Sequence, residues 1–128
     1  MQVNIPISLG ELIDKITILE IKNKKITNEE KLFSIQKELS SLKNILKKLN
    51  LENDSLITLY EELLKINDEL WNIEDEIRLC EKNNIFNTSF IQLARSVYIT
   101  NDKRFEIKNK INKIFNSEIK EEKSYEDY

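Results

Sequence analysis

The chain contains one glycine, Gly10, and one proline, Pro6, among its 128 residues. Glycine supplies the positive φ angles of tight turns, so a sheet protein with many hairpins needs far more of it. Gly10 also stands alone, which excludes both the P-loop and the dinucleotide-binding glycine pattern. The scarcity of glycine therefore indicates an all-α fold, and the length fits a single domain over residues 1–128.

Charge and cysteine content exclude further classes of function. Because the chain has no histidine, it can hold neither a serine or cysteine nucleophile paired with histidine nor a histidine zinc site. Its net charge of −3 argues against a nucleic acid polymer as partner. The single Cys80 cannot form an internal disulfide, which suits a reducing compartment. With no leader-like start and no long apolar run, we expect a cytoplasmic protein without a membrane partner.

The apolar positions predict a bundle of about five helices. Ser8 and Glu11 form a capping-box pattern before a first helix over about 9–25. Leucines and isoleucines at steps of three and four then form a heptad seam over 32–49, and a second such segment follows over 55–82. Because only a short polar turn separates these two segments, we expect them to pair as a long antiparallel, coiled-coil-like hairpin.

The rest of the chain is predicted to hold two shorter helices. Thr27 and Ser89 are the expected caps of the second and fourth helices, and a loop is expected over 82–88. Stop-and-start residues at 100–102 then predict a break before a fifth helix. The charged end, residues 120–128, is expected to fray unless something docks it.

One face of the 55–82 segment is polar where its seam should be apolar. At about 100° per residue, five side chains fall within one arc of the helix. They are Asn67, Trp71, Glu74, Asp75 and Arg78. One interpretation is an asparagine that fixes the helix register beside a Glu74–Arg78 ion pair. The other is a polar pocket floored by Trp71, and the pattern leaves both open.

A second polar group lies near the predicted fourth and fifth helices. It comprises Arg95, Tyr98, Asn101, Asp102, Arg104, Lys108 and Asn112. Two cations one helical turn apart suit a phosphate or carboxylate, and a nearby aromatic ring could stack on a base. The alternative is an ordinary helix junction with a solvated basic face. Because 54–78 is acidic and 101–114 is basic, we expect the two groups to meet, either as one site or as one salt-bridge network.

Two further features have open interpretations. Gly10 is either tolerated in a first helical turn or allows a close approach where backbone N–H groups attract an anion. Carboxylates such as Glu11, Asp14, Glu74 and Asp75 permit an enzyme hypothesis. Helical nucleotide pyrophosphohydrolases hold Mg²⁺ with acids on facing helices, and the spacing here resembles theirs only loosely.

Several motif blocks in order resemble an uncharacterised family of small bacterial and phage proteins, a domain of unknown function. The blocks are Ile7–Glu20, Asn67–Arg78, Leu93–Tyr98, Asn101–Asn112 and Glu121–Tyr125. The resemblance spans nearly the whole chain and implies no activity. It does imply that the two polar groups belong to the motif blocks of that family, and that Glu121–Tyr125 is more than a random tail.

The sequence leads to three functional hypotheses. The first is a helical protein that binds an anionic small molecule, such as a nucleotide or nucleotide-derived signal, between the last three helices; in a phage it could sequester that signal. The second is a structural or adaptor protein whose 32–49 seam pairs with a copy of itself, as a homo-oligomer, or with another helical protein. The third is a Mg²⁺-dependent nucleotide hydrolase. Binding is favoured over catalysis, no cofactor is predicted, and enzyme activity is left open.

Overall fold

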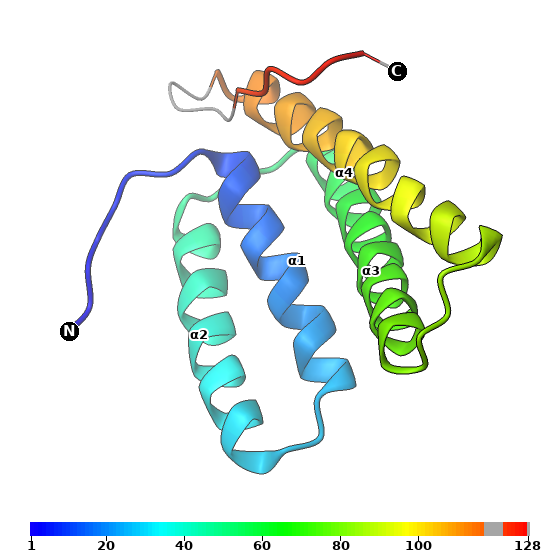
Figure 1. Cartoon of the computed structure of the whole chain (residues 1–128). Coiled ribbons are helices and arrows are strands. Elements are labelled where there is room, and N and C mark those ends of the chain that lie inside the picture. Colours follow the sequence, from blue (N-terminus) through cyan, green and yellow to red (C-terminus); the bar gives the residue numbers. More distant parts are fainter. Residues whose placement is uncertain (117–121, 128) are drawn as a thin grey trace.

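The computed structural model describes residues 1–116 and 122–127, which contain four α-helices and no strand. The helices are α1 (Leu9–Lys25), α2 (Glu29–Lys48), α3 (Asp54–Lys82) and α4 (Thr88–Ile114). Figure 1 shows α2 on one side of α1, and α3 with α4 on the other. The predicted all-α class is confirmed for this part of the chain, although the number of helices is four where about five were expected.

The helices pair differently from the prediction. α2 packs against α1, and α3 packs against α4, so the bundle consists of two helical hairpins joined through α1 (Figure 1). The expected long pair of α2 with α3 is wrong. The reason lies in α1, whose buried residues face more than one direction, so that it packs between the other helices and meets the seam of α2.

The core consists of two apolar clusters on different faces of α1. The first joins α1 to α2 and is built from Leu12, Ile16, Leu19, Ile35 and Leu39. The second joins α1 to α3 and α4 and is built from Ile13, Leu56, Leu63, Ile107 and Ile111. Leu12 and Ile13 are adjacent in sequence but belong to different clusters, because consecutive side chains on a helix point about 100° apart. α1 is therefore the central element of the fold.

The predicted break at residues 100–102 is wrong, because α4 continues through them as one helix. Thr100 is buried, and Asn101 and Asp102 are half-buried within the helix. Their weak helix propensity is only a weak prior, which tertiary packing overrides. Here Ile107 and Ile111 anchor the second half of α4 to the core.

Asparagine begins and ends most of these helices. The side chains of Asn28, Asn53 and Asn87 accept backbone N–H bonds as N-caps, so the expected caps at Thr27 and Ser89 are wrong by one and two positions. Three more asparagines take the left-handed conformation that usually favours glycine. They are Asn50, Asn84 and Asn116, with φ of 51°, 52° and 49°. A chain with one glycine can therefore still turn sharply after its helices.

The distal half of the α3–α4 hairpin extends beyond the core, since none of residues 71–99 is buried. The chain after α4 is irregular over residues 122–127. The expectation of a frayed end over 120–128 falls partly on residues outside the described ranges. No helix in the described part of the chain is long and apolar enough to span a membrane.

Candidate functional site

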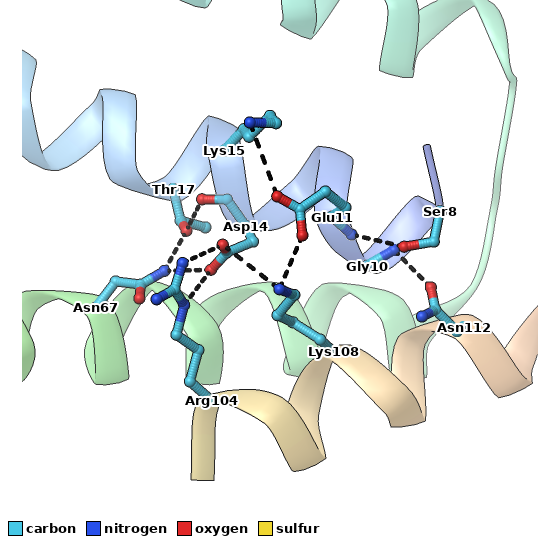
Figure 2. Close-up of polar contacts among 10 residues, drawn as sticks. All are labelled: Ser8, Gly10, Glu11, Asp14, Lys15, Thr17, Asn67, Arg104, Lys108 and Asn112. Carbon is cyan, nitrogen blue, oxygen red and sulfur yellow. Dashed lines mark hydrogen bonds and ion pairs between the residues drawn. The ribbon is translucent and has the colours of Figure 1, made fainter. Parts of the chain in front are cut away.

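A buried carboxylate, that of Asp14 in α1, joins three helices (Figure 2). Arg104 of α4 donates from Nε to Oδ1 at 2.9 Å and from Nη2 to Oδ2 at 2.5 Å. Asn67 of α3 donates from Nδ2 to the same Oδ1 at 2.9 Å. Asp14 is 1% exposed, so these bonds replace the water that burial removes.

Asn67 is the polar residue that interrupts the seam of α3. Its Nδ2 also donates to Oγ1 of Thr17 at 2.9 Å, and the Thr17 hydroxyl donates to the backbone carbonyl of Asp14 at 2.8 Å. Among the residues that the structure describes, no buried side-chain nitrogen or oxygen lacks a hydrogen-bond partner. Asn67 therefore fixes α3 against α1, because a shift of either helix would leave buried polar groups unpaired.

The surroundings of Asp14 lower its pKa. Burial by itself would raise the pKa of the carboxyl, because it penalises the charged form. The hydrogen bonds from Arg104 and Asn67, together with the positive charges of Arg104 and Lys108, outweigh burial and hold the pKa below its ordinary value of 3.8. Asp14 is therefore ionised at neutral pH and orients the Arg104 guanidinium.

Lys108 forms the next contact along the same side of α4. Its side chain is 7% exposed, and its Nζ lies 2.8 Å from Oε2 of Glu11 and 3.9 Å from Oδ2 of Asp14. Lys15 approaches the other oxygen of Glu11 at 3.7 Å. The Ser8 hydroxyl accepts the Glu11 backbone N–H as predicted for the cap, but the Glu11 carboxylate binds these lysines. Carboxylates of α1 thus alternate with cations of α4.

Gly10 lies at a close contact between α1 and α4. Its backbone N–H donates to Oδ1 of Asn112 at 2.7 Å (Figure 2). A Cβ at this position would lie 2.6 Å from the carbonyl oxygen of Lys108 and 2.8 Å from Asn112 Oδ1, closer than atoms tolerate. The interpretation of Gly10 as merely tolerated is wrong: the close approach needs glycine, and its N–H binds Asn112.

The five polar residues predicted on one arc of α3 meet at a hollow between α1, α3 and α4. This hollow, called the Trp71 hollow below, has a volume of about 300 Å³. Its lining comprises Ile18, Ile21, Asn67, Leu70, Trp71, Glu74, Asp75, Arg78 and Arg104. Apolar side chains from α1 and α3 form much of its wall, and charged side chains from α3 and α4 lie around them. The structure therefore brings the first predicted group together with Arg104 of the second.

Arg104 also lines a second hollow. It has a volume of about 200 Å³ and is called the polar hollow. Its described lining comprises Glu11, Asn101, Arg104, Phe105, Lys108 and Lys123. Three of these side chains are cations and one is a carboxylate. Since Arg104 lines both the Trp71 hollow and the polar hollow, it is the residue that connects them.

Other residues of the second predicted group lie close to residues 123–127. Tyr98, Asn101 and Asp102 line a third hollow of about 590 Å³, which α4 shares with residues 123–127. Arg95 is exposed on α4 and lines none of these three hollows. The second group is thus divided among the three hollows, and Arg95 and Asn112 line none of them.

Sequence reasoning missed the structural importance of Asp14 and Thr17 and did not single out Lys123. A signal for Asp14 was present, because it lies among buried positions of α1, between Ile13 and Ile16. An acid within an apolar stripe needs a buried cation as partner. The Mg²⁺ hypothesis treated Asp14 as a metal ligand. In residues 1–116 and 122–127, no three acidic or cysteine side chains gather in a way that could hold a metal ion.

Comparison with known proteins gives one match. The model of a family described as "Family of unknown function (DUF6165)" matches residues 1–128. No curated protein and no solved structure matches the chain. The resemblance to an uncharacterised family is confirmed over the whole length, and the family description carries no activity. A function must therefore be inferred from the site.

Proposed function

The chain belongs to DUF6165, a family of unknown function, and we propose that it binds a small anionic molecule with a planar apolar part, such as a nucleotide. The observation that carries the proposal is the position of Arg104, which lines both the Trp71 hollow and the polar hollow. A nucleotide has two parts that match these surroundings. Its base would lie in the Trp71 hollow, and its phosphate would lie in the polar hollow.

The lining of the Trp71 hollow suits a planar group. Trp71 is half-buried, so part of its ring system is open to a ligand. Stacking of a base on an aromatic side chain is worth about 1–3 kcal/mol. Ile18 and Leu70 add apolar surface, and the carboxylates of Glu74 and Asp75 can accept hydrogen bonds from base amino groups or ribose hydroxyls. The volume of about 300 Å³ lies at the lower end of the range for small-molecule sites.

The lining of the polar hollow suits a phosphate. Arginine and lysine are the side chains that bind phosphate most strongly, and Asn101 adds an amide that can donate. Asp14 holds Arg104 in place and Glu11 holds Lys108, so neither side chain has to be immobilised on binding. This preorganisation lowers the entropic cost of association.

The two alternative functions have less support. The 32–49 seam, on which homo-oligomerisation was predicted to depend, buries Ile35 and Leu39 against α1. A hydrolase would need converging carboxylates, whereas Asp14 and Glu11 are bound to cations. Binding without turnover would suit sequestration of a signalling nucleotide.

A thermal-shift screen tests the proposal. The panel comprises nucleoside mono- and triphosphates, cyclic nucleotides and inorganic phosphate, with the unmodified chain and two variants. A ligand at 100 times its Kd adds about 2.7 kcal/mol to the free energy of unfolding, which raises the Tm by several degrees. We expect at least one nucleotide to do so.

The two variants locate the site. Trp71→Leu removes the stacking surface and should abolish the shift, whereas Phe33→Leu changes an exposed aromatic residue on α2 and should preserve it. If no member of the panel stabilises the unmodified chain, the proposal fails. If Trp71→Leu responds as strongly as Phe33→Leu, binding takes place elsewhere.

A further inference from the structure

Lys123 is positioned between two hollows by aromatic rings. Its Nζ lies 5.2 Å from the centroid of the Phe105 ring and 5.7 Å from that of Tyr125. Such cation–π contacts hold an ammonium group in place without neutralising its charge. Among the described residues, no carboxylate forms an ion pair with Lys123. The lysine is half-buried and lines both the polar hollow and the hollow at the end of the chain.

The position of Lys123 adds a third cation to the lining of the polar hollow. Arg104 and Lys108 already line it from α4. Asp14 pairs with Arg104 and Glu11 pairs with Lys108, so Lys123 is the cation of this lining that those two carboxylates do not bind. An anionic group bound in the hollow would be attracted to its ammonium group. The chain segment that carries Lys123 therefore brings charge to the place where a phosphate would lie.

We infer that residues 122–127 are part of the ligand site, and that Lys123 binds the phosphate-type group of the ligand in the polar hollow. The inference rests on the proposed function, since it names a further residue of the same site. It gives residues 122–127 a specific role: side chains of α1, α3 and α4 surround the base, while Lys123 joins Arg104 and Lys108 around the phosphate. Phe105 and Tyr125 keep the ammonium group close to the hollow before the ligand arrives.

Calorimetry with phosphorylated and unphosphorylated ligands tests the inference. The probes are the monophosphates of adenosine, guanosine, cytidine and uridine, each compared with its nucleoside. Lys123→Ala should weaken the binding of the preferred monophosphate about tenfold, the size of one charge-assisted hydrogen bond. It should leave the binding of the matching nucleoside unchanged. Lys123→Arg, which keeps the charge, should retain most of the affinity.

Lys110→Ala is the matched control, because Lys110 is an exposed lysine of α4 that lines none of the three hollows. It should bind the monophosphate as the unmodified chain does. If Lys123→Ala binds it equally well, or loses affinity for nucleoside and monophosphate alike, the inference is overturned while the proposed function stands. If the unmodified chain binds none of the monophosphates or nucleosides, both the inference and the proposed function fail.

Discussion

Asp14 and Arg104 lie ninety positions apart in sequence, yet the guanidinium of Arg104 donates two hydrogen bonds to the Asp14 carboxylate. The pair joins α1 to α4. Arg104 retains 29% exposure of its side chain, whereas Asp14 is almost wholly enclosed. Asp14 is therefore the structural partner of the pair, whereas Arg104 also lines the Trp71 hollow and the polar hollow.

Loss of the Arg104 side chain should lower the free energy of unfolding more than loss of an exposed charge. Arg104→Ala leaves the Asp14 carboxylate buried without its main partner, and we expect the free energy of unfolding to fall by about 3 kcal/mol or more. Arg95→Ala, on the exposed side of the same helix, should change it by less than about 0.5 kcal/mol. Urea denaturation measures both. Equal stability of the two variants would show that the Asp14–Arg104 pair contributes nothing to the fold.

The same pair predicts how stability depends on pH. Because the pKa of Asp14 is lower in the folded chain than its ordinary value of 3.8, ionised Asp14 stabilises the fold above that value. This contribution is lost as the pH falls through the folded pKa, below 3.8. We expect the difference in unfolding free energy between the unmodified chain and Asp14→Asn to shrink as the pH drops from 5 through this range. A difference that does not change with pH would contradict a lowered pKa.

Substitution of the single glycine should destabilise the chain, contrary to helix propensity. Alanine in place of glycine normally stabilises a helix by about 1 kcal/mol. At Gly10, however, the new methyl group would collide with the Lys108 carbonyl and with Asn112. We expect Gly10→Ala to lower the free energy of unfolding by about 1–3 kcal/mol, as measured by thermal or urea denaturation. Ser34→Ala, at an exposed position of α2, is the control; a stabilised Gly10→Ala would mean that α1 and α4 are not in close contact.

At an asparagine with positive φ, we expect glycine to be tolerated better than alanine. Asn84 follows α3 with φ of 52°, a conformation that costs most residues about 1–2 kcal/mol. We therefore expect Asn84→Ala to lower the free energy of unfolding by about 1 kcal/mol and Asn84→Gly to leave it unchanged or raise it. Chemical denaturation of the two variants side by side gives the comparison. The prediction is refuted if alanine and glycine are equally tolerated.

The helical class and most helix positions could be predicted from local pattern, while the pairing of helices could not. The heptad seam of α2 shows that it packs against another helix, but not which one. Both α1 and α3 are neighbours of α2 in sequence and could have packed against its seam. In the structure α1 does so, through the apolar side chains of Leu12, Ile16 and Leu19. The break expected at 100–102 shows the same limit, since the core contacts of Ile107 and Ile111 are distant in sequence.

The candidate site was predictable on one helix at a time. The spacing of Asn67, Trp71 and Arg78 places them on one face of α3, and in the structure they line one hollow. The connection to Arg104 depends on α1, because Asp14 orients the guanidinium. Lys123 could not be predicted for another reason: contacts with two aromatic rings position it, and no periodic pattern in the sequence indicates such contacts.

Fluorescence of Trp71 is the measurement that tests the central claim most directly. The chain has one tryptophan, which lines the hollow proposed to hold the base, so any change in its emission reports on that place. A nucleotide selected by the thermal screen should quench or shift the emission along a saturable curve, with the same Kd that calorimetry gives. Inorganic phosphate alone should leave the emission unchanged. Calorimetric binding without any change in Trp71 emission would contradict the account, because the ligand would then lie outside the Trp71 hollow.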